Sequence, residues 1–533
     1  MSKRTKWLLG IAAIAALVVG WQVVVLATSL PGSNFEIDTD ANLKVDNAAP
    51  SIDWASVNET RKTDTASGQN DESFGQGTKE DTAVPSIVTG GIPPNKSDLK
   101  FFGVYQEGNT STGFLNLFWS RVQDPSGTTN MDFELNKRQC TPGTNDADCT
   151  SNGVTPIRSV GDVLIIYDLS QGGVNPVLSI RRWTASGAWG PATDLTAASD
   201  ATGSINSSPI PAGDSDGLGA QSARTFGEAQ VKLSVILPAG TCASFGSAYL
   251  KSRSSDSFTA ALKDFVPPVP VSVTNCGRVV VKKVDEGGQP LTGAEFTINP
   301  ANSATPSDNT LNEVGTTGVH CIDNLLIGTQ YTITETKAPP GYDPDPTSFT
   351  FTPSQSGSCS DVTGSTNPDK TFTNVAQKGA IQVTKTAKHA DTSGNTSPNL
   401  AATFTVKKNG TSVGTITTDG TTGKGCLGDL PLGSYTVEET NGPNGYAKDT
   451  DTETAAVNSK GTCLSGFVNV SFENTPLTNL TVSVDSHVDG GTASTITCDN
   501  GGPNGSTGPN GDGSETASDL EPGTYTCKVV IDP

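Results

Sequence analysis

Three kinds of reactive side chain, a lysine amine, a glutamate carboxyl and an asparagine carboxamide, recur in a fixed order within residues 277–476. In each occurrence the lysine ends an apolar stretch, the glutamate follows a tyrosine by four residues, and the asparagine follows a phenylalanine by two. A neutral amine can attack a carboxamide, and a neighbouring carboxyl can carry protons to the departing ammonia. Burial favours this chemistry, because it lowers the pKa of a lysine and raises the pKa of a carboxyl. The two sets are Lys283, Glu335 and Asn374, followed by Lys385, Glu439 and Asn474.

The elements that must position these side chains belong to a repeat of about a hundred residues that occurs twice in the sequence. The first copy opens GRVVVKKVD and closes KTFTNV, and the second opens GAIQVTKTA and closes VSFENT. These stretches predict strands, and period-two alternation places Val279, Val281 and Lys283 on one face, so that Lys283 rather than Lys282 points inward. A single set of these residues would be explained best as ordinary solvated side chains, whereas two sets in register favour a reactive arrangement.

The most specific piece of the repeat is YTITETKAPPGY (331–342), which SYTVEETNGPNGY (434–446) matches with its Ala-Pro lost. Through these motifs the two copies, expected as domains at 277–376 and 377–476, resemble SpaA/CnaB-type prealbumin-like domains of Gram-positive pilins and adhesins. The resemblance implies a reverse-immunoglobulin β-sandwich in which a lysine on the first strand forms an isopeptide bond with an asparagine on the last strand, assisted by a buried acid. Carried over by position, it implies bonds Lys283–Asn374 and Lys385–Asn474, promoted by Glu335 and Glu439.

Length and composition set the class of protein. A chain of 533 residues is too long for one core, and 58 glycines and 33 prolines with frequent Ser/Thr runs indicate many short strands and turns. The formal net charge of -21 argues against nucleic acid or an anionic membrane surface as a partner. We therefore predict an all-β protein, in which an amino-terminal jelly-roll-like β-sandwich precedes the tandem prealbumin-like sandwiches.

The ten cysteines fall into five pairs of sequence neighbours, and the two repeats place their pairs alike. The pairs have no CxxC spacing, and the chain has only three histidines, so we expect no metal site and no cofactor. Five disulfides are the better interpretation, and they indicate an oxidising compartment. We expect Cys140 to pair with Cys149, Cys242 with Cys276, Cys321 with Cys359, Cys426 with Cys463, and Cys498 with Cys527.

The amino end has the pattern of an export signal. A basic start, SKRTK, precedes an apolar run from Trp7 to Ala27. The run is also long enough to span a bilayer, so residues 1–30 are expected to be either a cleaved signal peptide, which we favour, or an uncleaved anchor. Both alternatives place the rest of the chain outside the cell, because the positive end stays in the cytoplasm.

Residues 34–276 contain alternating apolar runs such as DVLIIYDLS and AQVKLSVILP, which predict a β-sandwich of unknown activity. Residues 58–99 are polar and are expected to form one or two long loops. The stretches FEIDTDANLKVDNAAPSIDWASV (35–57) and SFGSAYLKSRSSDSFTAALKDF (244–265) resemble the amino-terminal domain of secreted actinobacterial proteins that carry prealbumin-like repeats. That resemblance implies a location and an architecture, and no established activity.

A hydrolase is disfavoured in this segment. The sequence GDSDG at 213–217 fits GxSxG, but it lies in a Pro/Gly-rich loop and no histidine precedes residue 320. Asp132 and Glu134 alternate along a strand and could serve a glycosidase, yet such pairs are common on solvated strand faces. We therefore predict that the protein is not an enzyme.

This segment could also bind a sugar, if tryptophan rings formed a platform on which the sugar stacks. Trp54, Trp119, Trp183 and Trp189 supply the rings. Trp119 and Trp183 lie in apolar strands and suit the core, which leaves Trp189, in SGAWGP, as the better candidate for an exposed ring.

Residues 477–533 look like a shortened third prealbumin-like module. Ser486 stands where the lysine is expected and Val529 where the glutamate is expected. The closing asparagine is absent, so we predict no isopeptide bond there.

Together these features predict an extracellular, adhesin-like surface protein whose stalk is stabilised by Lys–Asn isopeptide bonds and disulfides. The alternative is a binding module, in which residues 34–275 recognise a glycan or a host or environmental protein and the stalk is a spacer. The expected partners are the cell envelope and such a ligand. Nucleic acid is excluded, and membrane contact is expected only through an uncleaved amino-terminal segment.

Overall fold

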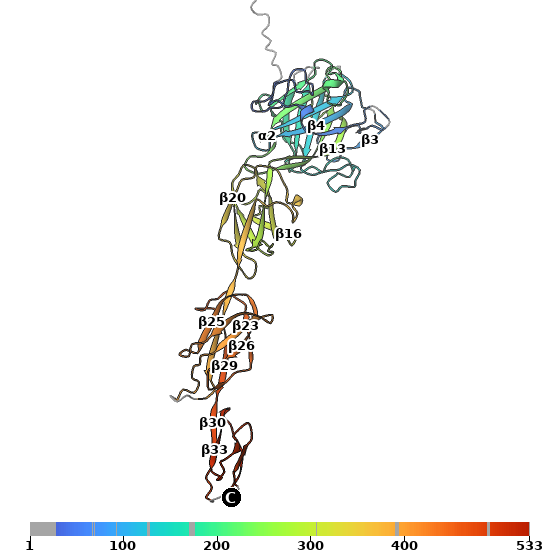
Figure 1. Cartoon of the computed structure of the whole chain (residues 1–533). Coiled ribbons are helices and arrows are strands. Elements are labelled where there is room, and N and C mark those ends of the chain that lie inside the picture. Colours follow the sequence, from blue (N-terminus) through green and yellow to red (C-terminus); the bar gives the residue numbers. More distant parts are fainter. Residues whose placement is uncertain are drawn as a thin grey trace, which may run out of the picture.

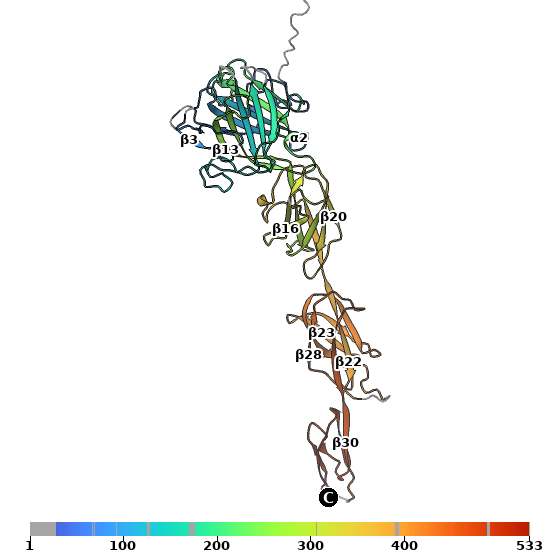
Figure 2. The ribbon, with the colours of Figure 1, turned by 180° about the vertical axis from the view of Figure 1, so that it is seen from behind.

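The computed structural model describes residues 28–531 except 67, 69, 92, 125–127, 170–175, 305, 390–393 and 488–490. The described chain is almost entirely β-structure and forms an elongated row, with the largest sandwich at one end and the carboxyl-terminal unit at the other (Figure 1). Figure 2 shows the same row from behind. The predicted export signal or anchor falls almost wholly on residues 1–27, outside the described residues. Within the described part, no helix is both long and apolar enough to cross a membrane.

The amino-terminal unit is a sandwich of two antiparallel sheets, as predicted. One sheet has the order β1-β4-β5-β11-β10 and the other has the order β3-β2-β13-β12-β6-β7-β8-β9. Its elements are η1 (Trp54–Ser56), β1 (Thr60–Thr63), β2 (Glu72–Phe74), β3 (Ile87–Thr89), β4 (Leu99–Glu107), β5 (Phe114–Arg121), β6 (Thr129–Asn136), β7 (Val163–Leu169), β8 (Val177–Arg182), β9 (Thr193–Asp194), β10 (Ala201–Ile205), η3 (Ala212–Asp214), β11 (Phe226–Lys232), α2 (Leu233–Ile236), β12 (Ser244–Arg253) and β13 (Leu262–Thr274).

Every residue of β5 is buried, because both faces of its sheet are covered. Leu117 and Trp119 pack in the core between the two sheets. Phe118, on the opposite face, packs with Phe35 and Trp54 from the preceding segment. A strand buried on both faces is largely apolar, and the polar residues of β5, which are Asn116, Ser120 and Arg121, are buried as well.

The segment 58–99 differs from the expectation of long loops. It contributes the short strands β1, β2 and β3, two of which, β1 and β3, lie at sheet edges. An edge strand has a solvated side, so it tolerates the polar residues that concealed these strands in the sequence.

The first repeat folds as one curled sheet with the order β19-β21-β14-β17-β16-β15-β18-β20. Its first and last long strands, β14 and β21, pair in parallel. Val281, Phe296, Ile333 and Phe372 lie in the enclosed core. The elements are β14 (Cys276–Asp285), β15 (Glu295–Asn299), β16 (Thr310–Val314), β17 (Val319–Leu326), β18 (Tyr331–Lys337), β19 (Tyr342–Asp343), β20 (Ser348–Phe351), η4 (Cys359–Asp361) and β21 (Lys370–Ala376).

The second repeat has two four-stranded sheets, β25-β22-β29-β27 and β24-β23-β26-β28. Here too the first and last long strands, β22 and β29, pair in parallel. Val383, Phe404, Val437 and Phe472 lie between the sheets. The strands are β22 (Lys378–Ala387), β23 (Thr403–Lys408), β24 (Thr411–Thr417), β25 (Lys424–Pro431), β26 (Gly433–Asn441), β27 (Tyr446–Ala447), β28 (Thr452–Val457) and β29 (Val468–Pro476).

The terminal unit is smaller, with a two-stranded sheet β30-β33 and a three-stranded sheet β32-β31-β34. Val484, Ile496 and Cys498 make up its small core. The strands are β30 (Thr478–Val484), β31 (Thr495–Cys498), β32 (Asn504–Ser506), β33 (Gly513–Leu520) and β34 (Cys527–Val530).

Successive units are joined by single residues. Asn275 separates β13 from β14, Gln377 separates β21 from β22, and Leu477 separates β29 from β30. An ion pair of 2.7 Å between Lys460 and Asp343 connects the two repeats. Short junctions of this kind leave little freedom between neighbouring units.

Five disulfides join the cysteines in the predicted neighbour pairs. In the sandwich, Cys140 is bonded to Cys149 nine residues later, which closes a short loop in the connection between β6 and β7. Both of these cysteines are buried, Cys140 completely and Cys149 with 8% of its surface exposed. The bond therefore holds a long, otherwise irregular connection against the sandwich.

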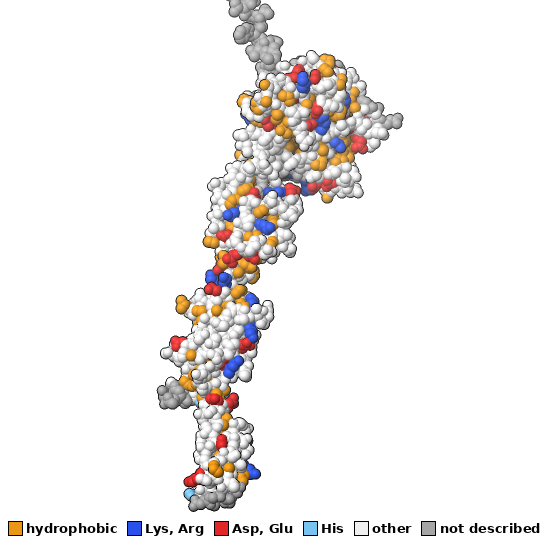
Figure 3. Space-filling model, in the orientation of Figure 1, with side chains coloured by type: hydrophobic (Ala, Val, Ile, Leu, Met, Phe, Trp, Pro, Cys, Tyr) orange, Lys and Arg blue, Asp and Glu red, His pale blue; other side chains and the backbone are white. Residues whose placement is uncertain are grey.

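The other four disulfides lie at the junction with the stalk and within it. Cys242–Cys276 links the sandwich to the first residue of β14. Cys321–Cys359 and Cys426–Cys463 take corresponding places in the two repeats, and Cys498–Cys527 joins β31 to β34. On the face drawn in Figure 3, acidic and basic side chains are interspersed along the row.

Candidate functional site: two buried Lys–Glu–Asn sets

The parallel pairing of first and last strands brings the lysine and asparagine of the first repeat together. Lys283 on β14 is the Cα partner of Phe372 on β21, and Asn374 lies two residues further along β21. Lys283 and Asn374 are completely buried, whereas Lys282 is partly exposed. Glu335 reaches the same place from β18.

The three polar groups of this first set are in mutual contact. Lys283 Nζ donates a hydrogen bond to Asn374 Oδ1 and lies 3.1 Å from Glu335 Oε1. Asn374 Nδ2 donates a hydrogen bond of 2.9 Å to the same Oε1. The amine therefore faces the carboxamide that it would attack, and the carboxyl contacts both the nucleophile and the leaving nitrogen.

The second repeat reproduces this geometry. Lys385 on β22 donates a hydrogen bond to Asn474 Oδ1 on β29, and its Nζ lies 3.2 Å from Glu439 Oε2. Asn474 Nδ2 donates to Glu439 Oε1 at 3.0 Å. All three side chains are buried.

Two phenylalanine rings enclose each lysine tip. The Lys283 Nζ lies 5.9 Å from the centre of the Phe296 ring and 5.8 Å from that of Phe372. In the second repeat, the Lys385 Nζ lies 5.9 Å from the Phe404 ring and 5.6 Å from the Phe472 ring. These rings exclude water from the amine, and Phe372 and Phe472 are the residues two before each asparagine.

Burial lowers the pKa of Lys283 below its ordinary value, although Glu335 opposes the shift. The pKa of Lys385 is lowered for the same reason, against the opposing charge of Glu439. Desolvation disfavours the charged amine, and the uncharged amine is the nucleophile. The two sites thus combine contact geometry with a favourable shift in protonation.

An aspartate in each repeat, which sequence reasoning missed, orients the glutamate. The backbone N–H of Asp345 donates to Glu335 Oε2 at 2.6 Å, and that of Asp449 donates to Glu439 Oε2 at 2.9 Å. Each aspartate lies ten residues after its glutamate, and Lys385 Nζ lies 3.8 Å from Asp449 Oδ2. The equal spacing in the two copies is the sequence signal that could have revealed them.

The pair Asp132 and Glu134 does not lie on a solvated strand face. Both carboxylates are completely buried on β6. Arg253 pairs with Asp132 at 2.5 Å, and Arg158 pairs with Glu134 at 2.8 Å. A glycosidase needs carboxyl groups that can reach a sugar, so the burial removes this pair from consideration.

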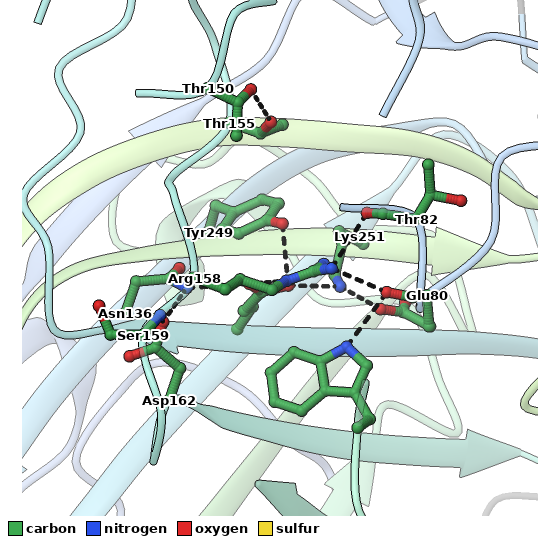
Figure 4. A network of polar contacts seen from close by, with 12 residues as sticks. Glu80, Thr82, Asn136, Thr150, Thr155, Arg158, Ser159, Asp162, Tyr249 and Lys251 are labelled. Carbon is green, nitrogen blue, oxygen red and sulfur yellow. Dashed lines mark hydrogen bonds and ion pairs between the residues drawn. The ribbon is translucent and has the colours of Figure 1, made fainter. Parts of the chain in front are cut away.

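Glu134 belongs to a buried network of charges, part of which is drawn in Figure 4. Lys251 Nζ lies 2.7 Å from Glu134 Oε2 and also pairs with Glu80, and the Tyr249 hydroxyl donates to Glu134 Oε2 at 2.9 Å. Burial alone would raise the pKa of Glu134, but Arg158 and Lys251 outweigh it and hold that pKa well below the usual range. Burial raises the pKa of Glu80 to about 7, against the charge of Lys251. Two acidic side chains, Glu80 and Glu134, are thus paired with two basic side chains, Arg158 and Lys251, in the interior of the sandwich.

The expectation that Trp189 is exposed is wrong. Its ring is buried against Trp183, with centroids 5.3 Å apart, and its Nε1 donates to the Glu80 carbonyl at 3.1 Å. The Arg158 guanidinium lies over both rings. Trp54 and Trp119 are buried too, so the four tryptophans of the described chain provide no sugar-stacking platform.

Among known protein families, one matches both repeats. The family model described as "SpaA: Prealbumin-like fold domain" matches residues 277–367 and 380–470. No curated protein matches the chain.

Several solved structures are similar at low identity. The Bacillus anthracis TIE protein is 17% identical with a TM-score of 0.34, and the match covers 80% of this chain and 69% of that chain. GBS52, the minor pilin of Streptococcus agalactiae, is 13% identical with a TM-score of 0.16, over 38% of this chain and 96% of that chain. BcpA, the major pilin subunit of Bacillus cereus, is 14% identical with a TM-score of 0.16, over 37% and 99%. By the family match, each repeat carries the sequence pattern of a SpaA prealbumin-like fold domain.

Proposed function

We propose that this chain is an extracellular surface protein in which two self-crosslinked repeats form a stalk that displays the amino-terminal sandwich. The observation that carries the proposal is the same buried contact of lysine, glutamate and asparagine in both repeats. The reaction is maturation, because each set reacts once, and the protein is not an enzyme.

The proposed step forms an amide between the lysine Nζ and the asparagine Cγ. The bond between Cγ and Nδ2 breaks, and Nδ2 leaves as ammonia after it takes up the proton that the amine loses. Glu335 and Glu439 contact both nitrogens and carry that proton between them. Contact between the partners in the folded chain makes the step unimolecular, which removes a large part of the barrier.

The arrangement of strands explains why the bond would serve a stalk. Tension enters a repeat at its first strand and leaves at its last strand, and these two strands lie side by side in both repeats. A covalent bond between them passes tension directly from one strand to the other. The five disulfides support an oxidising location, and therefore display outside the cell.

Intact mass spectrometry of the full chain tests the proposal. Each isopeptide bond should lower the mass by one ammonia, beyond the two hydrogens lost at each disulfide. Glu335→Ala and Glu439→Ala should each restore one ammonia, and the double variant should restore both. Glu295→Ala is the matched control, because Glu295 lies in the first repeat with Glu335, is exposed and forms an exposed ion pair with Lys337.

Peptide mapping then locates each bond. Digestion should release a branched peptide that joins Lys283 to Asn374 and another that joins Lys385 to Asn474. A wild-type mass without any ammonia loss, or a loss that persists in the double variant, would refute the crosslinked stalk.

A further inference from the structure

Four aspartates converge where the two sheets of the amino-terminal sandwich meet. Asp64 follows β1 and Asp98 precedes β4 in one sheet, whereas Asp71 precedes β2 and Asp264 lies on β13 in the other. One carboxylate oxygen from each of Asp64, Asp71 and Asp264 lies within 4.8 Å of the other two. Asp71, Asp98 and Asp264 are completely buried, and Asp64 is half-buried. We call these four residues the aspartate cluster.

Two oxygens of the cluster are buried without a hydrogen-bond partner among the described residues. Asp264 Oδ2 accepts a hydrogen bond of 2.7 Å from the Leu99 N–H, but Asp264 Oδ1 accepts none. Asp64 Oδ1 accepts from the Thr65 N–H at 2.9 Å, whereas its buried Oδ2 also lacks a partner. A buried carboxylate oxygen that is left unsatisfied is costly to the fold, so an electropositive partner at either atom would stabilise it.

The charges that act on these two carboxylates come from other acids. Asp71, Asp98 and Glu72 act on Asp64, and Asp64, Asp71 and Asp98 act on Asp264. Several carboxylates in one enclosed place repel one another unless a proton or a cation neutralises them.

We propose that the aspartate cluster binds a calcium ion that links the two sheets of the amino-terminal sandwich. Carboxylate oxygens are the ligands of hard divalent cations, and the cluster offers no sulfur or imidazole that would favour zinc or copper. Calcium tolerates six to eight oxygens in irregular geometry, which suits carboxylates from three separate segments better than the strict octahedron of magnesium. The proposal concerns the sandwich alone and does not depend on the crosslinks in the stalk.

A second acidic group, Asp38, Asp40 and Asp46, provides a contrast. Asp40 and Asp46 are exposed. Asp38 Oδ1 accepts hydrogen bonds from the backbone of Asp40 and Ala41, so the loop itself satisfies it. This exposed group therefore supplies the control for the binding experiment.

Calcium binding is measured on the full chain after EGTA treatment, by titration calorimetry with CaCl2 and, separately, with MgCl2. Thermal unfolding with and without CaCl2 provides a second readout. The wild type should bind Ca2+ and should melt at a higher temperature in its presence, because a ligand that binds only the folded state stabilises it.

Asp264→Asn should weaken Ca2+ binding by about tenfold or more, because it removes a charge and a ligand oxygen. The calcium-dependent rise in melting temperature should shrink accordingly. The asparagine oxygen can still accept from the Leu99 N–H, so the variant should fold without calcium. Asp40→Asn, the control, removes an equal charge from the exposed group and should leave the binding intact.

Three results would overturn the proposal: no Ca2+ heat and no thermal shift in the wild type, unchanged Ca2+ affinity in Asp264→Asn, or preferential binding of Mg2+. If Asp264→Asn does not fold, Asp64→Asn is measured instead with the same expectations, since Asp64 is half-buried at the margin of the cluster.

Discussion

Lys283 and Asn374 touch inside the first repeat although 91 residues separate them in the sequence. Lys385 and Asn474 do the same in the second repeat across 89 residues. The contact exists because the first and last strands of each repeat pair in parallel, which places these two strands side by side. A bond at this point would therefore close almost the whole repeat into one loop.

Loss of that loop should destabilise the repeat measurably. Asn374→Ala removes the carboxamide, and by analogy with a disulfide of similar loop length it should lower the free energy of unfolding by about 4–5 kcal/mol. Urea unfolding of the full chain, followed by limited proteolysis at each urea concentration, reports the transition of this repeat. Asn312→Ala, at an exposed position of the same repeat, should change little, and an equal effect of both substitutions would contradict the loop model.

The unreacted lysine should make stability depend on pH. In Asn374→Ala the amine of Lys283 remains buried, and its folded-state pKa lies below the usual 10.5. Between the two pKa values the unfolded chain binds more protons than the folded chain, so the free energy of unfolding should rise with pH in that window. Denaturant titrations at several alkaline pH values measure the slope. Adding Lys283→Met should abolish it, and a slope that survives in this double variant has another source.

The buried charge network should be sensitive to loss of one acid. Glu134→Gln leaves Arg158 and Lys251 with one carboxylate fewer, and removal of one partner from a buried pair costs about 3–5 kcal/mol. Thermal unfolding of the full chain should show an earlier transition of the sandwich. Asp148→Asn, which breaks an exposed pair with Arg138, should cost less than about 1 kcal/mol. Comparable losses would mean that the network contributes no more than a surface pair.

Pulling on single molecules should distinguish crosslinked from open repeats. A crosslinked first repeat should not lengthen, whereas Glu335→Ala should release the chain between Lys283 and Asn374. Of these 91 residues the disulfide Cys321–Cys359 holds back 38, so the first extension should be about 180 Å at roughly 3.4 Å per residue. Reduction of the disulfide should then release the remainder, about 130 Å. An extension of the same length in the wild type would exclude the crosslink.

The repeats and their strands could be predicted because each signal occurs twice in register. Alternation around Val279 and Val281 indicated the inward face of the first strand, and the like placement of the cysteines in the two repeats favoured the neighbour pairing that the structure shows. The aspartates at 345 and 449 escaped attention because their backbone N–H groups, which any residue could supply, make the contact with the glutamates.

The amino-terminal sandwich was harder to predict, because its polar contacts join distant segments. The partner of Asp132, Arg253, lies 121 residues away, and the partner of Glu134, Lys251, lies 117 residues away. Strand alternation alone could not distinguish a solvated carboxylate from one that a remote base neutralises. The expectation of no metal site rested on cysteine and histidine spacing, and that criterion does not consider carboxylates such as the three that lie close together in the aspartate cluster.

The disulfide between Cys242 and Cys276 gives the stalk a second connection to the sandwich, beside the peptide bond at Asn275. A force applied to β14 is therefore transmitted to the sandwich by two routes. One runs through the disulfide to Cys242, 34 residues upstream, and the other runs through β13. Strand β13 thus shares the load with the disulfide, and it cannot be peeled from its neighbours while the bridge is oxidised. Asp264 lies on this protected strand, so traction on the displayed unit would leave the aspartate cluster undisturbed.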